Sequence, residues 1–213
     1  MFDTTFVTKV YESIKISLLY WIYLLRGAVI YSVVPATIAL FFSINFLRKY
    51  DEDDTPIHQH FKNHYLKRSK MYTLPSFLFS IFILLLYVLL YFLNKESHAL
   101  SLLLTVICLY LLLKLVVLFT YSCYILTKRE WTIGKALMVG FWLSTRHLFF
   151  TVLIVAFFCG MFYLLRLHVF LFLVCFPALY GFTVLFLFES ISLPKILSKR
   201  KKTEAKKDDK KQI

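Results

Sequence analysis

Three ionisable residues fall within or beside long apolar stretches of the sequence: Arg26, Lys114 and Glu189. A charge in hydrocarbon costs on the order of 2.5–3.5 kcal/mol on insertion scales unless it is paired or hydrated. Lys114 lies near the middle of its stretch, where its side chain cannot easily reach either membrane surface. These residues form a candidate intramembrane polar site, whose chemistry would be ion pairing or the binding of a charged solute.

Each of the three also has a structural interpretation. Lys114 could pair with a neighbouring helix for packing alone. Glu189 lies at the end of its stretch, within reach of water, and suits an interfacial carboxylate. The Arg26 guanidinium could satisfy carbonyl groups exposed at a helix break, because it carries five donors. The sequence leaves the structural and the functional interpretations open.

His58, His60 and His64 could suggest a metal site, since His60 and His64 share one face of a helix. No Cys or Glu completes such a site at a useful spacing, so we interpret the histidines as facing lipid headgroups and expect no metal. The motifs G-x-S-x-G, H-E-x-x-H, G-x-x-x-x-G-K-[ST] and G-x-G-x-x-G are absent from the sequence. We therefore expect neither a catalytic site nor a cofactor.

The elements that position these residues must be membrane helices. Of the 213 residues, 60% are hydrophobic and 17% are charged, whereas soluble domains are about 45–50% apolar. This composition excludes an ordinary soluble fold and predicts an all-α, polytopic helical bundle.

Five apolar runs define the expected spans, and crossing the bilayer core takes roughly 20 helical residues. The first run is too long for one upright crossing and too short for two. We expect a long broken helix that crosses once, with the break between Tyr31 and Pro35. A paired or re-entrant arrangement is the alternative. The five runs cover residues 16–47, 74–93, 100–126, 148–165 and 169–188.

Basic residues gather in segments 48–70 and 127–147 and after Pro194, whereas segments 94–99 and 166–168 hold one each. The positive-inside rule places the basic segments and the C-terminus in the cytoplasm. A single first crossing then puts the N-terminus outside, and a paired arrangement puts it inside. The same rule explains the net charge of +13 without a nucleic-acid partner.

Two amphipathic segments precede helical hairpins. Thr55 and Pro56 suit a helix start, and apolar residues recur every four positions from Ile57; a similar segment lies at 131–147. We expect interfacial helices whose basic faces meet anionic headgroups. The pattern suggests a weak repeat of residues 55–126 and 132–190 within one membrane domain, 1–194. Residues 195–213 are predicted to be a disordered basic tail.

The stretch that contains Gly27, Pro35, Ala36, Thr37 and Ala39 resembles the first span of the YesL family of bacterial membrane proteins. That family typically has a glycine, a short apolar stretch and a P-A-T-x-A-like turn, followed by a basic loop with regularly placed aromatic residues. The matching loop here begins at Arg48-Lys49 and continues with Thr55-Pro-Ile-His-Gln-His-Phe61. Arg26, directly before the glycine, and the Lys-rich tail depart from the family pattern.

The resemblance implies a location and a genetic context but no reaction. YesL proteins are multi-pass proteins of the bacterial cell membrane, often encoded beside carbohydrate-uptake genes in Gram-positive bacteria. The resemblance therefore implies a non-enzymatic accessory or assembly component that works with subunits of an ABC importer. The alternative is a small transporter or channel built around Lys114, for which a homodimer is expected because five spans enclose little space.

Overall fold

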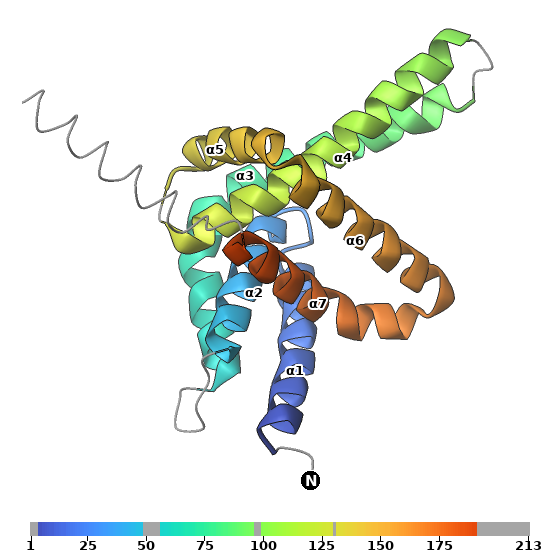
Figure 1. Cartoon of the computed structure of the whole chain (residues 1–213). Helices are drawn as coiled ribbons and strands as arrows, with labels where there is room; N and C mark the ends of the chain where they lie inside the picture. Colours follow the sequence, from blue (N-terminus) through green and yellow to red (C-terminus); the bar gives the residue numbers. More distant parts are fainter. Residues whose placement is uncertain (1–3, 49–55, 96–98, 130, 191–213) are drawn as a thin grey trace, which may run out of the picture.

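The computed structural model describes residues 4–48, 56–95, 99–129 and 131–190, and all regular structure within them is helical. Helices α3, α4, α6 and α7 are long and apolar enough to cross a membrane, and α2 is a shorter apolar helix. The predicted helical membrane bundle is confirmed (Figure 1). The helices are α1 (Thr4–Arg26), α2 (Val33–Leu47), α3 (Ile57–Leu93), α4 (Ala99–Lys128), α5 (Ile133–Arg146), α6 (Leu148–Leu167) and α7 (Val169–Ser190).

The first apolar run is broken, as predicted, but the break lies earlier, between Arg26 and Val33. Ala28 and Val29 have positive φ angles of 52° and 60°, so the chain turns sharply there. A Cβ atom at Gly27 would overlap the Ser32 side chain, which explains the glycine. Pro35 falls in the first turn of α2, where its missing N–H is tolerated. Proline therefore does not make the break.

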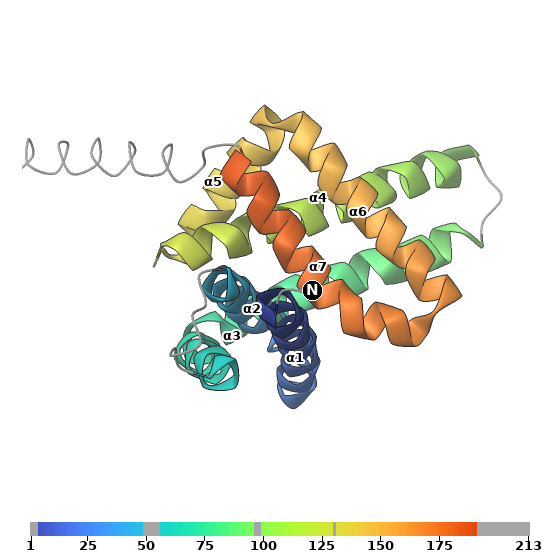
Figure 2. The ribbon, with the colours of Figure 1, turned by 60° about the horizontal axis from the view of Figure 1, so that its bottom comes forward.

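After this turn α2 packs back against α1, and the two helices lie side by side in Figure 1. This is the paired arrangement rather than the single crossing that we favoured from the sequence. Most of α2 is buried by α1, α3, α4 and α7, and Figure 2 looks along it with α1 and the start of α3 beside it. At 15 residues, or about 22 Å, α2 is shorter than the bilayer core. It is the central core helix of the protein.

The directions of the packed helices follow from contacts between numbered residues. The Ser17 Oγ accepts a hydrogen bond from the Ala178 N–H, and the Trp21 Nε1 donates to the Leu173 carbonyl at 2.7 Å. Pro177 provides no N–H for that carbonyl, so Trp21 replaces the missing helical bond. Because residue numbers rise along α1 as they fall along α7, the two helices are antiparallel. The start of α1 lies toward the end of the molecule where α2 finishes and α3 begins (Figure 1).

Helix α3 is one continuous helix of 37 residues, about 55 Å long. The prediction that its basic first part forms a separate interfacial helix is therefore wrong. That part packs antiparallel to α2, and the helix then bends near Pro75 and runs on into a projecting hairpin with α4 (Figure 1). Its apolar part begins at Leu74. The second amphipathic segment does form a separate helix, α5, before the α6/α7 hairpin.

Some predicted features lie outside the described residues: the basic tail 195–213 and Thr55. The proposed repeat of residues 55–126 and 132–190 stays a prediction. Each half does contain a helical hairpin, α3/α4 in the first and α6/α7 in the second.

Candidate functional site

Glu189 forms an ion pair at the end of α7. Its carboxylate accepts a hydrogen bond of 2.6 Å from the Arg48 guanidinium, which follows the last residue of α2. The two side chains are 36% and 42% exposed, so the pair contributes at most about 1 kcal/mol of stability. Its effect is to join the ends of two core helices.

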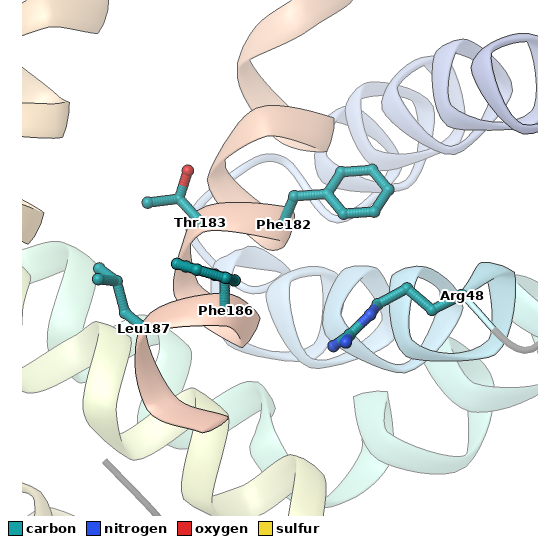
Figure 3. A pocket seen from close by; sticks show the side chains of 5 residues that line it. All are labelled: Arg48, Phe182, Thr183, Phe186 and Leu187. Carbon is teal, nitrogen blue, oxygen red and sulfur yellow. The ribbon is translucent and has the colours of Figure 1, made fainter. Parts of the chain in front are cut away.

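Beside this ion pair lies a pocket of about 380 Å³. Figure 3 shows the Arg48 side chain extending toward Phe186, with Phe182, Thr183 and Leu187 arranged along α7. Apart from Arg48 and one hydroxyl, the pocket is lined by apolar side chains. It provides one cation, already paired with Glu189, next to an apolar surface.

Arg26 is the last residue of α1, and its side chain is exposed. Among the described residues it makes no hydrogen bond or ion pair. The carbonyl of Leu24 at the break is instead satisfied by the Val29 N–H and by the Ser32 hydroxyl at 2.6 Å. The Arg26 charge is well placed for the C-terminal end of the α1 dipole.

Lys114 lies near the middle of α4 and is half-buried. Its ammonium group is 5.8 Å from the centre of the Tyr110 ring, within the range of a cation–π contact. It forms no ion pair with the described residues. Its helical face continues into Val117 and Tyr121, which are buried in the core. Arg26, Lys114 and Glu189 thus lie on three separate elements, and no described contact joins them.

The residues of the family-like motif act in packing. Ala36, Thr37 and Ala39 of α2 are almost completely buried, and the Thr37 hydroxyl donates back to the Val33 carbonyl. Small side chains allow helix backbones to approach closely in a membrane bundle. The motif therefore defines the core helix rather than a ligand site.

A buried cation was missed from the sequence. Arg68 is 6% exposed, and its Nη1 donates to the Leu126 carbonyl at 3.2 Å and to the Tyr72 hydroxyl at 3.3 Å. The Tyr72 hydroxyl donates in turn to the Trp131 carbonyl at 3.2 Å. This network joins α3 to the last turn of α4 and to Trp131, which precedes α5. A helical signal was present, because Arg68 and Tyr72 continue the apolar face of α3 from Tyr65.

We predicted that His60 and His64 face lipid headgroups. In the structure they stack on aromatic rings of α2 instead. The ring centres of His64 and Phe42 are 4.2 Å apart, and those of His60 and Phe46 are 4.3 Å apart. Burial, reinforced by the charges of nearby basic residues, lowers the pKa of His64 to about 4. His64 is therefore neutral at pH 7. Among the described residues no group of three or more His, Cys, Asp or Glu could hold a metal ion.

The fold and these contacts define a polytopic helical membrane protein with a buried central helix and a basic end. Residues 14–92, from within α1 through nearly all of α3, match a family described as "protein of unknown function, DUF624". No curated protein and no solved structure matches the chain. The family match covers the same elements as the sequence resemblance, and it assigns no activity to them.

Proposed function

We propose that this protein is a non-enzymatic accessory or assembly component of the bacterial cell membrane, linked to carbohydrate uptake. The observation that carries the proposal is the small share of its apolar helices that the chain itself buries. Only 11% of the residues are buried in the most apolar windows of α3, α4 and α6. These helices present most of their surface to lipid or to the helices of a partner.

The arrangement of the hairpins supports this proposal. The α3/α4 hairpin projects from the core in one direction, and the α6/α7 hairpin leaves it in another (Figure 1). Phe162 and Phe170, near the outer end of the second hairpin, are 72% and 80% exposed. Helix association in membranes depends on packing and hydrogen bonding, and long faces of this kind suit a subunit that packs beside other spans. The resemblance to YesL proteins, with which the DUF624 match is consistent, supplies the carbohydrate-uptake context.

The proposal is tested by site-specific photo-crosslinking in native membranes. A benzophenone amino acid at Phe162 should capture membrane subunits of an ABC importer when cells grow on the sugar that the importer takes up. The same probe at Leu66, on the basic extramembrane part of α3, serves as the control position. If importer subunits are no more abundant with the Phe162 probe than with the control, the partner assignment fails.

A second candidate function is a small transporter or channel, and the position of Lys114 favours it. Its charge lies near the middle of an apolar helix without an ion pair among the described residues, which is typical of solute pathways. Such a protein would work as a homodimer, since one chain encloses little space. Lys114→Leu should then abolish solute flux into proteoliposomes, whereas Lys95→Leu, at the outer end of the same hairpin, should not. Equal flux in both variants would exclude this function.

A further inference from the structure

An apolar groove of about 500 Å³ lies between α3 and α5, with α4 along its floor. Both α3 and α5 pack against α4, but they scarcely touch each other. Leu78 of α3 and Leu137 of α5, at the edges of the groove, are 60% and 37% exposed, whereas Leu126 at its floor is fully buried. Sites for small molecules have volumes of about 300–1,000 Å³. The groove is therefore a cavity of ligand size that opens sideways toward the bilayer.

One hydroxyl lies at the floor of this groove. Ser122 of α4 lines the groove, is 4% exposed, and its Oγ has no hydrogen-bond partner among the described residues. Other hydroxyls of α4 bond within the helix: Thr120 donates to the Val116 carbonyl at 3.0 Å, and Thr127 donates to the carbonyl one turn earlier at 2.8 Å. A buried hydroxyl without a partner is unfavourable. Ser122 is therefore available to a molecule that enters the groove.

Two backbone features leave space around this hydroxyl. A Cβ atom on Gly140 of α5 would lie 3.1 Å from the Ser122 Oγ, so the glycine avoids a close contact there. On the opposite wall Pro75 lines the groove at the point where α3 bends (Figure 1). The hydroxyl thus lies beside a gap between helices rather than inside a close-packed interface.

The lining of the groove determines the chemistry of its occupant. The described lining residues carry no charge and no hydroxyl besides that of Ser122. A charged headgroup would find no partner here, and burying it would be costly. Ser122 lies one helical turn before Leu126, where the apolar run of α4 ends, and the groove continues from there to Phe82 and Leu115, deeper in the apolar runs.

A fitting molecule is therefore one apolar chain with a single uncharged oxygen at the end nearest the basic segments. A diacyl phospholipid has two chains and a charged phosphate, for which this groove provides no cation among its described lining residues. We propose that the groove binds a single-chain neutral lipid of the long-chain alcohol class. Its oxygen forms a hydrogen bond with the Ser122 hydroxyl, and its chain lies between α3 and α5.

Photo-crosslinking of the full-length protein in dioleoyl phosphatidylcholine liposomes tests the proposal. Hexadecanol with a diazirine on its chain should label the groove segments of α3 and α4. Unlabelled hexadecanol should suppress this labelling, and hexadecane, which lacks the oxygen, should compete about fivefold more weakly, the factor that one hydrogen bond contributes. Phospholipid is in large excess in every sample. If added hexadecanol leaves the labelling unchanged, the groove holds ordinary bilayer chains and the proposal is wrong.

The role of the hydroxyl is tested by Ser122→Ala, which should abolish the difference between hexadecanol and hexadecane as competitors. Ser43→Ala is the matched control, because Ser43 of α2 also has a buried Oγ without a partner among the described residues and lies outside the groove. It should keep the fivefold difference. A difference that persists in Ser122→Ala, or that disappears in both variants, would overturn the proposal.

The position of the chain is tested by filling the groove. Leu78→Trp should abolish labelling, because the indole occupies the space between α3 and α5. Leu84→Trp adds the same side chain at a position of α3 that is 62% exposed and outside the groove, and it should be labelled like the wild type. Undiminished labelling of Leu78→Trp would place the alcohol in the surrounding lipid and contradict a site in the groove.

Discussion

Arg68 shows how one buried side chain fixes the end of another helix. Its guanidinium supplies donors to the Leu126 carbonyl, in the last turn of α4, where intrahelical partners run out. Arg68→Met should lower the free energy of unfolding by about 2–3 kcal/mol, because a charged hydrogen bond is lost and a buried carbonyl is left unpaired. Unfolding in mixed micelles measures the change. Lys70→Met, an exposed position two residues further on, should change stability by less than about 0.5 kcal/mol.

The lowered pKa of His64 predicts a stability that depends on pH. The unfolded chain binds a proton near pH 6.5, whereas the folded protein does so only near pH 4. The unfolded state therefore holds more protons between these values, and stability should fall as the pH drops through this window. After allowance for solvent screening, the loss between pH 7 and pH 5 is about 1 kcal/mol. His64→Gln should flatten this dependence in thermal unfolding, and the exposed His58→Gln should keep it. An identical pH slope in the wild type and His64→Gln would contradict the prediction.

At the scale of elements, Gly181 of α7 determines how closely α2 and α7 approach. A Cβ atom there would overlap the Cδ1 of Ile44. Gly181→Ala should therefore destabilise the protein by about 1–2 kcal/mol, and Ile44→Val by about 1 kcal/mol. The double variant should lose less than the sum, because valine lacks the atom that clashes. Gly160→Ala, which has open space around it, should be neutral or stabilising. Strict additivity in unfolding experiments would contradict this packing.

Elements marked by local composition could be predicted from the sequence, whereas features that depend on tertiary packing could not. The apolar runs of α3, α4, α6 and α7 could be located from composition alone, since lipid demands continuous apolar helices. The break before α2 was misplaced because proline is a strong local signal, whereas the real turn depends on the packing of Ser32 against Gly27. The role of Arg68 was missed because residue type alone does not show burial.

At the scale of the whole molecule, the pairing of α1 with α2 determines the side on which the chain begins. The chain reverses between α1 and α2, so the start of α1 lies toward the end of the molecule where α2 finishes and α3 begins (Figure 1). Phe42 stacks on His64 and Phe46 stacks on His60, so α2 and α3 are antiparallel. The basic first part of α3 therefore begins beside the end of α2. With the basic segments in the cytoplasm, the N-terminus should be cytoplasmic as well.

Cysteine labelling in intact cells tests this topology, in a background where Cys108, Cys123, Cys159 and Cys175 are replaced. Val7→Cys, near the start of α1, should react with a membrane-impermeant thiol reagent only after permeabilisation, like Lys62→Cys in the basic part of α3. Lys95→Cys, at the far end of the α3/α4 hairpin, should react without permeabilisation. Labelling of Val7→Cys in intact cells would mean that the first apolar run crosses the membrane once. In that case α1 and α2 could not form the hairpin that places α2 in the core.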